Sequence, residues 1–196
     1  MLPEEQLFPH INRLIEHKKR IIVAIDGMSA AGKSSFCDII EKVFGSSSCN
    51  IIRMDHFFLR PGQRTSERLA EPGGNIDYER FIEEVVTPLA SGDTFSYRPF
   101  NCKTQDFDEP ITVEPKPLTI IEGVYSMTPE ITAQSNYDIT VFMKIDKVEQ
   151  LRRLQERSPQ MYERFINEWI PMENKYFETF NIREKCHYMI TGDENE

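Results

Sequence analysis

The sequence has 196 residues, of which 39% are hydrophobic and 28% charged, and its formal net charge is −9 at pH 7. These values are ordinary for a globular chain and exclude a disordered one. The negative charge argues against general nucleic-acid binding, because polyanions bind basic surfaces.

No apolar stretch approaches the roughly 18 residues that a membrane span requires. The acidic start lacks the pattern of a secretory signal, so we expect a cytoplasmic protein. The four cysteines (Cys37, Cys49, Cys102 and Cys186) are scattered and form no C-x-x-C pair. They indicate neither a zinc site nor a disulfide framework.

Strands and helices are predicted to alternate along the chain. Apolar runs predict buried strands at 21–25, 50–54, 118–121 and 139–145 and an edge strand at 188–190. Apolar residues at helical spacing predict a short helix near Ile11 and longer helices over 33–44, 78–90, 146–157 and 160–180. Asp77 is a plausible N-cap of the helix at 78–90, and Pro171 is expected to interrupt the last helix.

This alternation predicts an α/β fold with three α/β/α layers around a parallel sheet. In such sheets ligands bind beyond the carboxyl ends of the strands. Acidic residues stand at those ends, namely Asp26, Asp55, Glu122 and Asp146. The long polar stretch 60–77 is a candidate substrate wall, because loops of that length are usually functional or disordered.

The segment "DGMSAAGKS" at 26–34 follows the first predicted strand and precedes a predicted helix. Its glycines, Gly27 and Gly32, let the backbone bring its N–H groups close to phosphate. Lys33 can reach the β- and γ-phosphates, and the Ser34 hydroxyl can ligate Mg²⁺. The alternative is a glycine-rich turn that binds nothing. We expect a P-loop that binds ATP through residues Gly27, Ser29, Ala30, Ala31, Gly32, Lys33, Ser34 and Ser35.

Two further motifs suggest phosphoryl transfer rather than switching or transport. Asp55 in "MDHFF" can accept a proton from an attacking hydroxyl while the adjacent aromatic residues exclude water. Glu122 in "IIEGVY" can hold Mg²⁺ directly or through water. The alternatives are that Asp55 caps the next segment and that Glu122 is a solvated strand-end acid. The guanine-reading sequence N-K-x-D is absent.

Three arginines, Arg152, Arg153 and Arg157, lie on one predicted helix. Arginines close to a transferring phosphate neutralise the charge on its oxygens. A solvated helix face with ion pairs to Glu149 and Glu156 explains them equally well.

In combination, these residues resemble the uridine kinase family of P-loop kinases over about residues 20–190. The shared landmarks are "IDGMSAAGKSS", "MDHFF", "GGNIDYERF", "FSYRPF", "IIEGVY" and "LRRLQER". The resemblance implies that Asp55 is the catalytic base, with Phe58 beside it, and that Ser34 and Glu122 serve Mg²⁺. It further implies a lid over about 152–164 whose arginines close on the phosphates, with Arg152 binding ATP and Arg153 and Arg157 taking part in catalysis. It also implies that Asp77 holds the ribose hydroxyls and that Tyr97 lies at the nucleoside base.

Two positions depart from that family. Cys102 stands where uridine–cytidine kinases carry a pyrimidine-reading histidine, and Arg164 stands at the position of a glutamine. A thiol is a poor hydrogen-bond partner and arginine offers only donors, so the acceptor can differ. Arg164 would suit an anionic acceptor or form a surface pair with Glu163 or Glu168.

We therefore expect residues 1–196 to form a single kinase domain that uses ATP and Mg²⁺ on a small-molecule substrate, most simply the 5′-hydroxyl of uridine or cytidine. One alternative is a kinase for another riboside, such as nicotinamide riboside, or for a small non-nucleoside alcohol. Another is a nucleotide-binding regulatory protein without an acceptor. The sequence does not indicate the oligomeric state.

Overall fold

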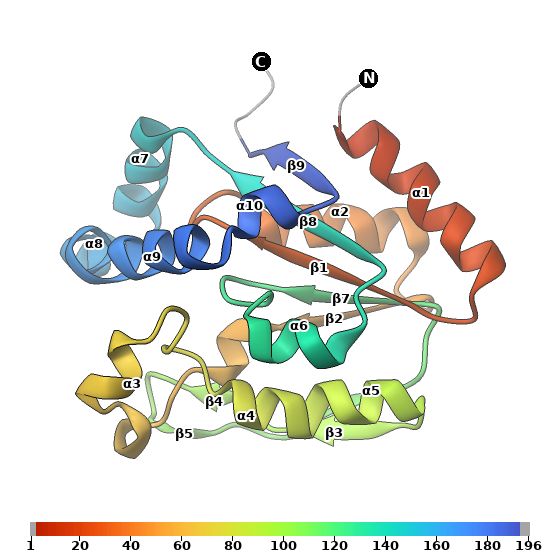
Figure 1. Ribbon diagram of the computed structural model, residues 1–196, viewed down its shortest axis with the longest axis horizontal. Helices are drawn as coiled ribbons and strands as arrows, with labels where there is room; N and C mark the ends of the chain where they lie inside the picture. The colour runs from red at the N-terminus through yellow and green to blue at the C-terminus, as the bar shows by residue number, and fades with distance from the viewer. Residues whose placement is uncertain (1–2, 193–196) are drawn as a thin grey trace.

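The computed structural model describes residues 3–192, in which five parallel strands form a central sheet of order β2-β7-β1-β8-β9 (Figure 1). These strands are β1 (Ile21–Gly27), β2 (Cys49–Arg53), β7 (Leu118–Glu122), β8 (Ile139–Lys144) and β9 (Tyr188–Thr191). All four neighbouring pairs are parallel. The predicted α/β fold is confirmed, including its edge strand. Residues 1–2 and 193–196 of the predicted domain lie outside the described residues.

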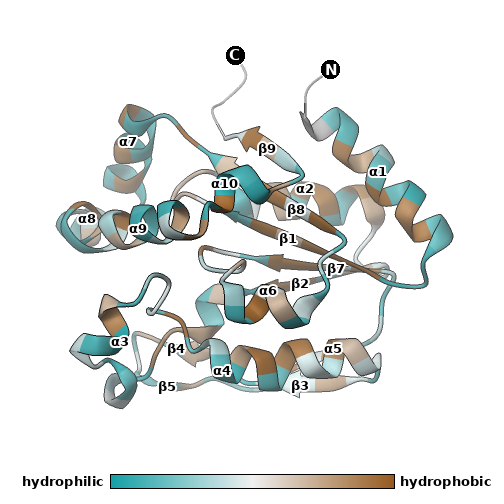
Figure 2. Ribbon diagram, in the orientation of Figure 1, coloured by the Kyte–Doolittle hydropathy of each residue, from teal (hydrophilic) through white to brown (hydrophobic). Residues whose placement is uncertain are grey.

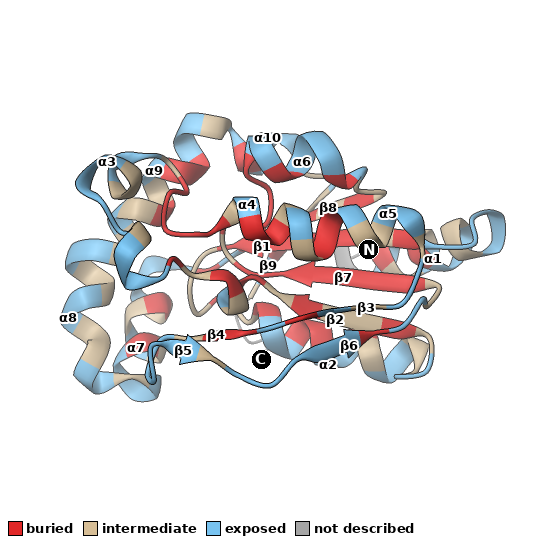
Figure 3. Ribbon diagram, turned by 90° about the horizontal axis from the view of Figure 1, so that it is seen from below, coloured by how far each residue is buried: buried red, intermediate tan, exposed pale blue. Residues whose placement is uncertain are grey.

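Helices cover both faces of this sheet. One face packs against α1 (Pro3–His17) and α2 (Lys33–Phe44), and the other against α4 (Tyr78–Phe81), α5 (Thr87–Ser91), α6 (Pro129–Ser135), α9 (Ile170–Phe180) and α10 (Ile182–Lys185). Val23 and Ile25 face the first layer while Ala24 faces the second, as the two-residue period of a strand requires. Apolar residues concentrate in the strands (Figure 2), which are also the most buried segments (Figure 3). The three layers are those predicted.

The order of the strands locates the ligand-binding edge of the sheet. Strands β2 and β7 lie on one side of β1, and β8 and β9 lie on the other. The chain leaves the carboxyl ends of these strands for α2, for the 3-10 turn η1 (Met54–Phe57) and for α7 (Lys147–Arg157). In open α/β sheets a crevice forms beyond the strand ends at such a divergence.

Two prolines are accommodated by wide helical turns. The π-helical segments η3 (Ile82–Val86) and η5 (Phe165–Trp169) come just before Pro88 and Pro171, respectively. Proline lacks the N–H that an α-helix needs, and its ring crowds the carbonyl group four residues earlier. In a π-turn the backbone hydrogen bonds span five residues instead of four, so the pairing around the proline is altered. The predicted interruption at Pro171 is therefore wrong. The chain stays helical from α8 (Tyr162–Arg164) through η5 into α9.

Short elements that lack a clear sequence pattern complete the fold. The stretch 60–77 contains η2 (Pro61–Gln63) and α3 (Ser66–Ala70), and the turn η4 (Pro159–Met161) follows α7. Two small antiparallel sheets pair β3 (Phe95–Tyr97) with β6 (Ile111–Val113) and β4 (Phe100–Asn101) with β5 (Asp106–Phe107). Within residues 3–192, no helix has the length and apolar character needed to cross a membrane. All four cysteines are free thiols.

Candidate active site

The loop between β1 and α2 has the shape that phosphate binding requires. Gly27 has a φ of +141°, and a Cβ added there would lie 2.1 Å from the carbonyl oxygen of Met143 on β8. Only glycine fits this position. Gly32 is left-handed, with a φ of 86°, and no side chain caps the start of α2. The first N–H groups of α2, which have no acceptor within the helix, and the helix dipole therefore favour an anion at this point.

A cavity of about 510 Å³ opens above this loop. Each residue from Ser29 to Ser35 lines it, whereas Gly27 shapes the loop from the end of β1. Lys33 is buried, and its Nζ donates to the carbonyl oxygens of Gly27 (2.8 Å) and Met28 (2.9 Å). The ammonium group is thus held at the floor of the cavity.

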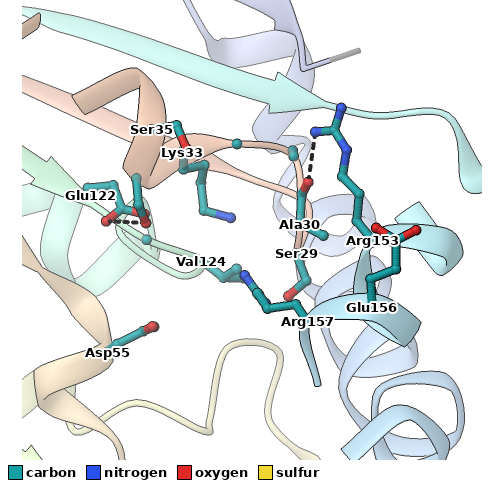
Figure 4. Close-up of a pocket in the computed structure, with 14 residues that line it drawn as sticks. Ser29, Ala30, Lys33, Ser35, Asp55, Glu122, Val124, Arg153, Glu156 and Arg157 are labelled. Carbon is teal, nitrogen blue, oxygen red and sulfur yellow. Dashed lines mark hydrogen bonds between the residues drawn. The ribbon is translucent and has the colours of Figure 1, made fainter. Parts of the chain in front are cut away.

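Two carboxylates at the carboxyl ends of other strands line the same cavity (Figure 4). Asp55 lies in η1, directly after β2, and is exposed. Among residues 3–192, no group donates a hydrogen bond to its carboxylate, which therefore remains available to a ligand. Glu122 ends β7 and is buried. The sheet brings Lys33, Asp55 and Glu122 together from three separate segments.

Glu122 and Ser34 form a pair of oxygen ligands. Ser34 Oγ lies 3.4 Å from both carboxylate oxygens of Glu122, and Arg53 Nη1 donates to Glu122 Oε2 at 2.9 Å. Burial raises the pKa of Glu122, while the nearby Lys33 and Arg53 cations oppose that rise. Hard oxygen donors suit Mg²⁺. The described residues contain no group of three or more His, Cys, Asp or Glu that could hold a metal. Mg²⁺ fits here if phosphate and water supply its other ligands.

The three predicted arginines separate into two groups. Arg153 and Arg157 line the cavity; Arg153 Nη1 donates to Ala30 O at 3.3 Å, and Arg153 Nε forms an ion pair with Glu149 at 2.7 Å. Arg152 does not line it; its guanidinium forms ion pairs with Glu149 (2.6 Å) and with Glu156 (2.7 Å). These are the ion pairs that the sequence left open as an alternative.

Phe58, Asp77 and Tyr97 are tied to the segment that carries Asp55. Phe58 forms a bridge with Ile76, and Asp77 N donates to Phe57 O at 2.7 Å. Asp77 caps α4 as predicted, because its carboxylate accepts from Arg80 N at 3.1 Å. The same carboxylate accepts from Gln63 Nε2 at 2.8 Å.

Tyr97 is buried on β3 and lies next to His56, the residue that follows Asp55 in the sequence. Its hydroxyl lies 3.2 Å from Nδ1 of His56. Burial lowers the pKa of His56, and the negative charge of Asp55 opposes that change. The neutral imidazole is therefore the favoured form of His56 at pH 7, so His56 is a polar neighbour of Asp55 rather than a cation.

The two positions that depart from the uridine kinase pattern lie at the surface. Cys102 is exposed in the turn between β4 and β5, and β4 contacts η1. Arg164 forms an ion pair with Glu168 at 3.2 Å, and its guanidinium lies 4.7 Å from the centre of the Trp169 ring. Arg164 does not line the cavity. The surface pair with Glu168 is one of the two arrangements that its sequence context suggested.

Sequence reasoning missed several residues at the site. Arg53 stands at the carboxyl end of β2, so the rule that selected Asp55 could have selected it too. Glu156 lines the cavity from the helix on which only arginines were chosen. Glu173 binds Ser29, which precedes it by 144 residues, and no local pattern connects the two.

The comparisons with known proteins agree with this geometry. Residues 22–159 match the model of the family described as Phosphoribulokinase / Uridine kinase. A phosphoribulokinase from Synechocystis sp. is 27% identical over 130 residues, which are 65% of this chain but only 38% of that protein. A uridine kinase from Geobacillus sp. is 24% identical over 175 residues and 82% of each chain is covered.

Solved structures share the fold. A possible uridine kinase from Bacillus stearothermophilus has a TM-score of 0.68 at 18% identity, over 94% of this chain and 99% of that one. D-glycerate 3-kinase from Cryptococcus neoformans has a TM-score of 0.56 at 14% identity, over 88% and 87% of the two chains. Kinases of the matched family use ATP with Mg²⁺, the predicted cofactors. The chain belongs to the phosphoribulokinase/uridine kinase family.

Proposed function

We propose that this protein transfers the γ-phosphate of ATP to the 5′-hydroxyl of uridine or cytidine. The family consists of P-loop kinases that act on hydroxyl groups of small molecules. The observation that carries the proposal is that Asp55, with no hydrogen-bond donor on its carboxylate among the described residues, faces the same cavity as Lys33 of the P-loop (Figure 4). A free carboxylate beside a phosphate cradle is the arrangement that activates a hydroxyl.

The proposed step is a single in-line displacement. The hydroxyl oxygen forms a bond to the γ-phosphorus as its proton passes to Asp55, and the bond from that phosphorus to the bridging oxygen breaks to release ADP. Lys33, Arg153 and Arg157 line the cavity where charge develops on the phosphoryl oxygens and stabilise it there. Ser34 would ligate Mg²⁺, and Glu122 would hold it directly or through water. The ion would neutralise negative charge on the β- and γ-phosphates.

Residues on the acceptor side support a nucleoside. Asp77 lies on the segment bound to Phe57; it is buried and pairs with Gln63 and Arg60, so it binds ribose hydroxyls only if these partners are exchanged. Phe58, which is half-buried, provides apolar surface near Asp55, whereas Tyr97 is buried and packs against the ring of Phe57. In the same proposal, residues 152–164 act as a lid of the single domain, and the protein works in the cytoplasm on a small molecule rather than on nucleic acid.

A second candidate acceptor is favoured by Cys102 and Arg164. The thiol of Cys102 is a weak hydrogen-bond partner, and Arg164 forms an ion pair with Glu168. Neither side chain therefore offers the hydrogen bonds to the polar edge of uracil that the residues at these positions in uridine–cytidine kinases would make. Another riboside, such as nicotinamide riboside, or a small non-nucleoside alcohol is then the acceptor, with the same chemistry at Asp55. Relatives of the same fold include a D-glycerate 3-kinase.

An acceptor panel assayed by ADP release distinguishes these candidates. Purified protein is incubated with ATP, Mg²⁺ and one of uridine, cytidine, nicotinamide riboside or D-glycerate, and kcat/KM is compared. The proposal predicts that uridine or cytidine has the largest value. A preference for either of the others contradicts the pyrimidine assignment while keeping the kinase reaction. ATP binding without turnover on a wide panel would instead support the regulatory alternative.

A further inference from the structure

Every polar backbone and side-chain group of Ser29, the third residue of the P-loop, is bound by helices distant in sequence. The N–H of Ser29 donates to Glu173 Oε2 at 3.0 Å, and its hydroxyl donates to the other oxygen of the same carboxylate. The carbonyl oxygen of Ser29 accepts from Gln150 Nε2 at 2.9 Å. Glu173 lies on α9 and Gln150 on α7, and both are buried, at 4% and 2% exposure.

The next residue has a strained backbone. Ala30 has a φ of +62°, in the left-handed region that side chains with a Cβ disfavour. Such strain persists only where the surroundings determine the conformation. Here Ser29 is held on one side, and Arg153 Nη1 donates to the carbonyl oxygen of Ala30 on the other. Successive N–H groups around a left-handed residue form a concave anion site, and the cavity is lined by the residues that follow Ala30.

A buried carboxylate beside a phosphate site is electrostatically unfavourable, because its negative charge repels the phosphate and is removed from water. Its contacts must therefore compensate for that cost. A carboxylate accepts two donors at once, so Glu173 can bind both the N–H and the hydroxyl of Ser29. Lys33 provides a compensating positive charge: burial raises the pKa of Glu173, and Lys33 opposes that rise. A neutral side chain of similar length can make the same contacts only in part.

We propose that Glu173, supported by Gln150, is a positioning residue that holds the P-loop in its phosphate-binding shape before ATP arrives. It acts by fixing Ser29 and thereby stabilising the left-handed Ala30. This inference concerns the donor site and is independent of which acceptor is phosphorylated. The competing explanation is that Glu173 only ties α9 to the sheet and contributes to folding.

A double-mutant cycle with Ala30→Gly separates the two explanations. Wild type, Glu173→Ala, Ala30→Gly and the double variant are titrated with ATP and Mg²⁺ by isothermal calorimetry, without any acceptor. Glu173→Ala is expected to raise the Kd for ATP about tenfold, which corresponds to the cost of a left-handed alanine. In the Ala30→Gly background the same substitution is expected to raise Kd by less than about threefold, because glycine adopts that conformation without the penalty.

The proposal fails if Glu173→Ala raises Kd by the same factor in both backgrounds, or if it leaves Kd unchanged. Glu173→Gln retains an acceptor for Ser29 and is expected to keep Kd within about threefold of wild type; a loss as large as that of the alanine variant also contradicts a positioning role. Thermal unfolding of each protein checks folding. If Glu173→Ala does not fold, Ser29→Ala, which removes only the hydroxyl contact, takes its place, with a smaller coupling of the same sign. A failed acceptor panel would leave these binding results unaffected.

Discussion

The hydroxyl of Tyr176 donates to a buried acid beneath the P-loop. Asp26 is fully buried; its Oδ2 accepts from Tyr176 Oη at 2.7 Å and from Met127 N at 3.2 Å, and its Oδ1 accepts from Gly27 N at 2.7 Å. Burial raises the pKa of Asp26 from 3.8 to about 6, and the bond from Tyr176 limits that rise. Because the folded pKa is the higher one, the contribution of Asp26 to stability is greatest below about pH 4. That contribution falls as the pH rises through about 6.

We expect Tyr176→Phe to destabilise the protein more at pH 8 than at pH 5. At pH 8 Asp26 is ionised, and a hydrogen bond to a charged group contributes about 1.5–3 kcal/mol. At pH 5 the acid is mostly protonated, and a neutral hydrogen bond contributes about 1 kcal/mol. The ring contacts of Tyr176 with Tyr125 and Phe177 remain in the variant. The difference between the two pH values is therefore expected to be about 0.5–2 kcal/mol.

Urea unfolding at both pH values measures this difference, and Tyr137→Phe is the matched control. The Tyr137 hydroxyl donates to the carbonyl oxygen of Ser126 at 2.7 Å, an acceptor that does not titrate. Its loss should cost about 1 kcal/mol at either pH. If Tyr176→Phe lost the same unfolding free energy at pH 5 and pH 8, the ionisation of Asp26 between these pH values would be refuted. The same conclusion would follow if Tyr137→Phe showed the same pH dependence as Tyr176→Phe.

The remaining predictions concern the P-loop and helix α7. Lys33→Ala is expected to abolish turnover in the ADP-release assay, because it removes the cation at the floor of the cavity; a variant that turns over normally would contradict the site. Arg157→Ala is expected to lower kcat at least about tenfold, since it removes charge stabilisation, whereas Arg152→Ala should change kcat by less than about threefold because that residue does not line the cavity. Equal effects of the two substitutions would be inconsistent with the observed separation. In Gly27→Ala the new Cβ would lie 2.1 Å from Met143 O, so we expect a loss of about 3 kcal/mol or more in unfolding free energy; an unchanged melting temperature would show that the loop relaxes.

The sequence predicted most of the fold because its main elements carry local patterns. The buried strands are continuous apolar runs, and the P-loop is defined by residue types at fixed spacing between a strand and a helix. The strands β3 to β6 have two or three residues each and carry no period, so they were missed. The break expected at Pro171 did not occur because the preceding turn widened, an outcome that propensity rules do not anticipate.

The site was predictable in part, and the limits have a physical cause. Asp55 lies just beyond β2 and Glu122 is the last residue of β7, and the carboxyl ends of these parallel strands meet at one edge of the sheet. The spacing of Arg152, Arg153 and Arg157 on one helix could not show which of them reaches the loop, because that depends on how α7 packs. The contact between Glu173 and Ser29 depends on a tertiary approach across 144 positions. Such contacts are invisible to any window of sequence.

The central claim is that Asp55 takes the proton of the acceptor hydroxyl. The most direct test is to measure kcat with the best acceptor, together with the Kd for ATP, in wild type and Asp55→Asn. Removal of a general base is expected to lower kcat by about 10²–10⁴-fold. The Kd for ATP should stay within about twofold, since the exposed carboxylate holds no part of the P-loop in place. A variant that keeps most of its turnover would contradict the assignment of Asp55 as the base.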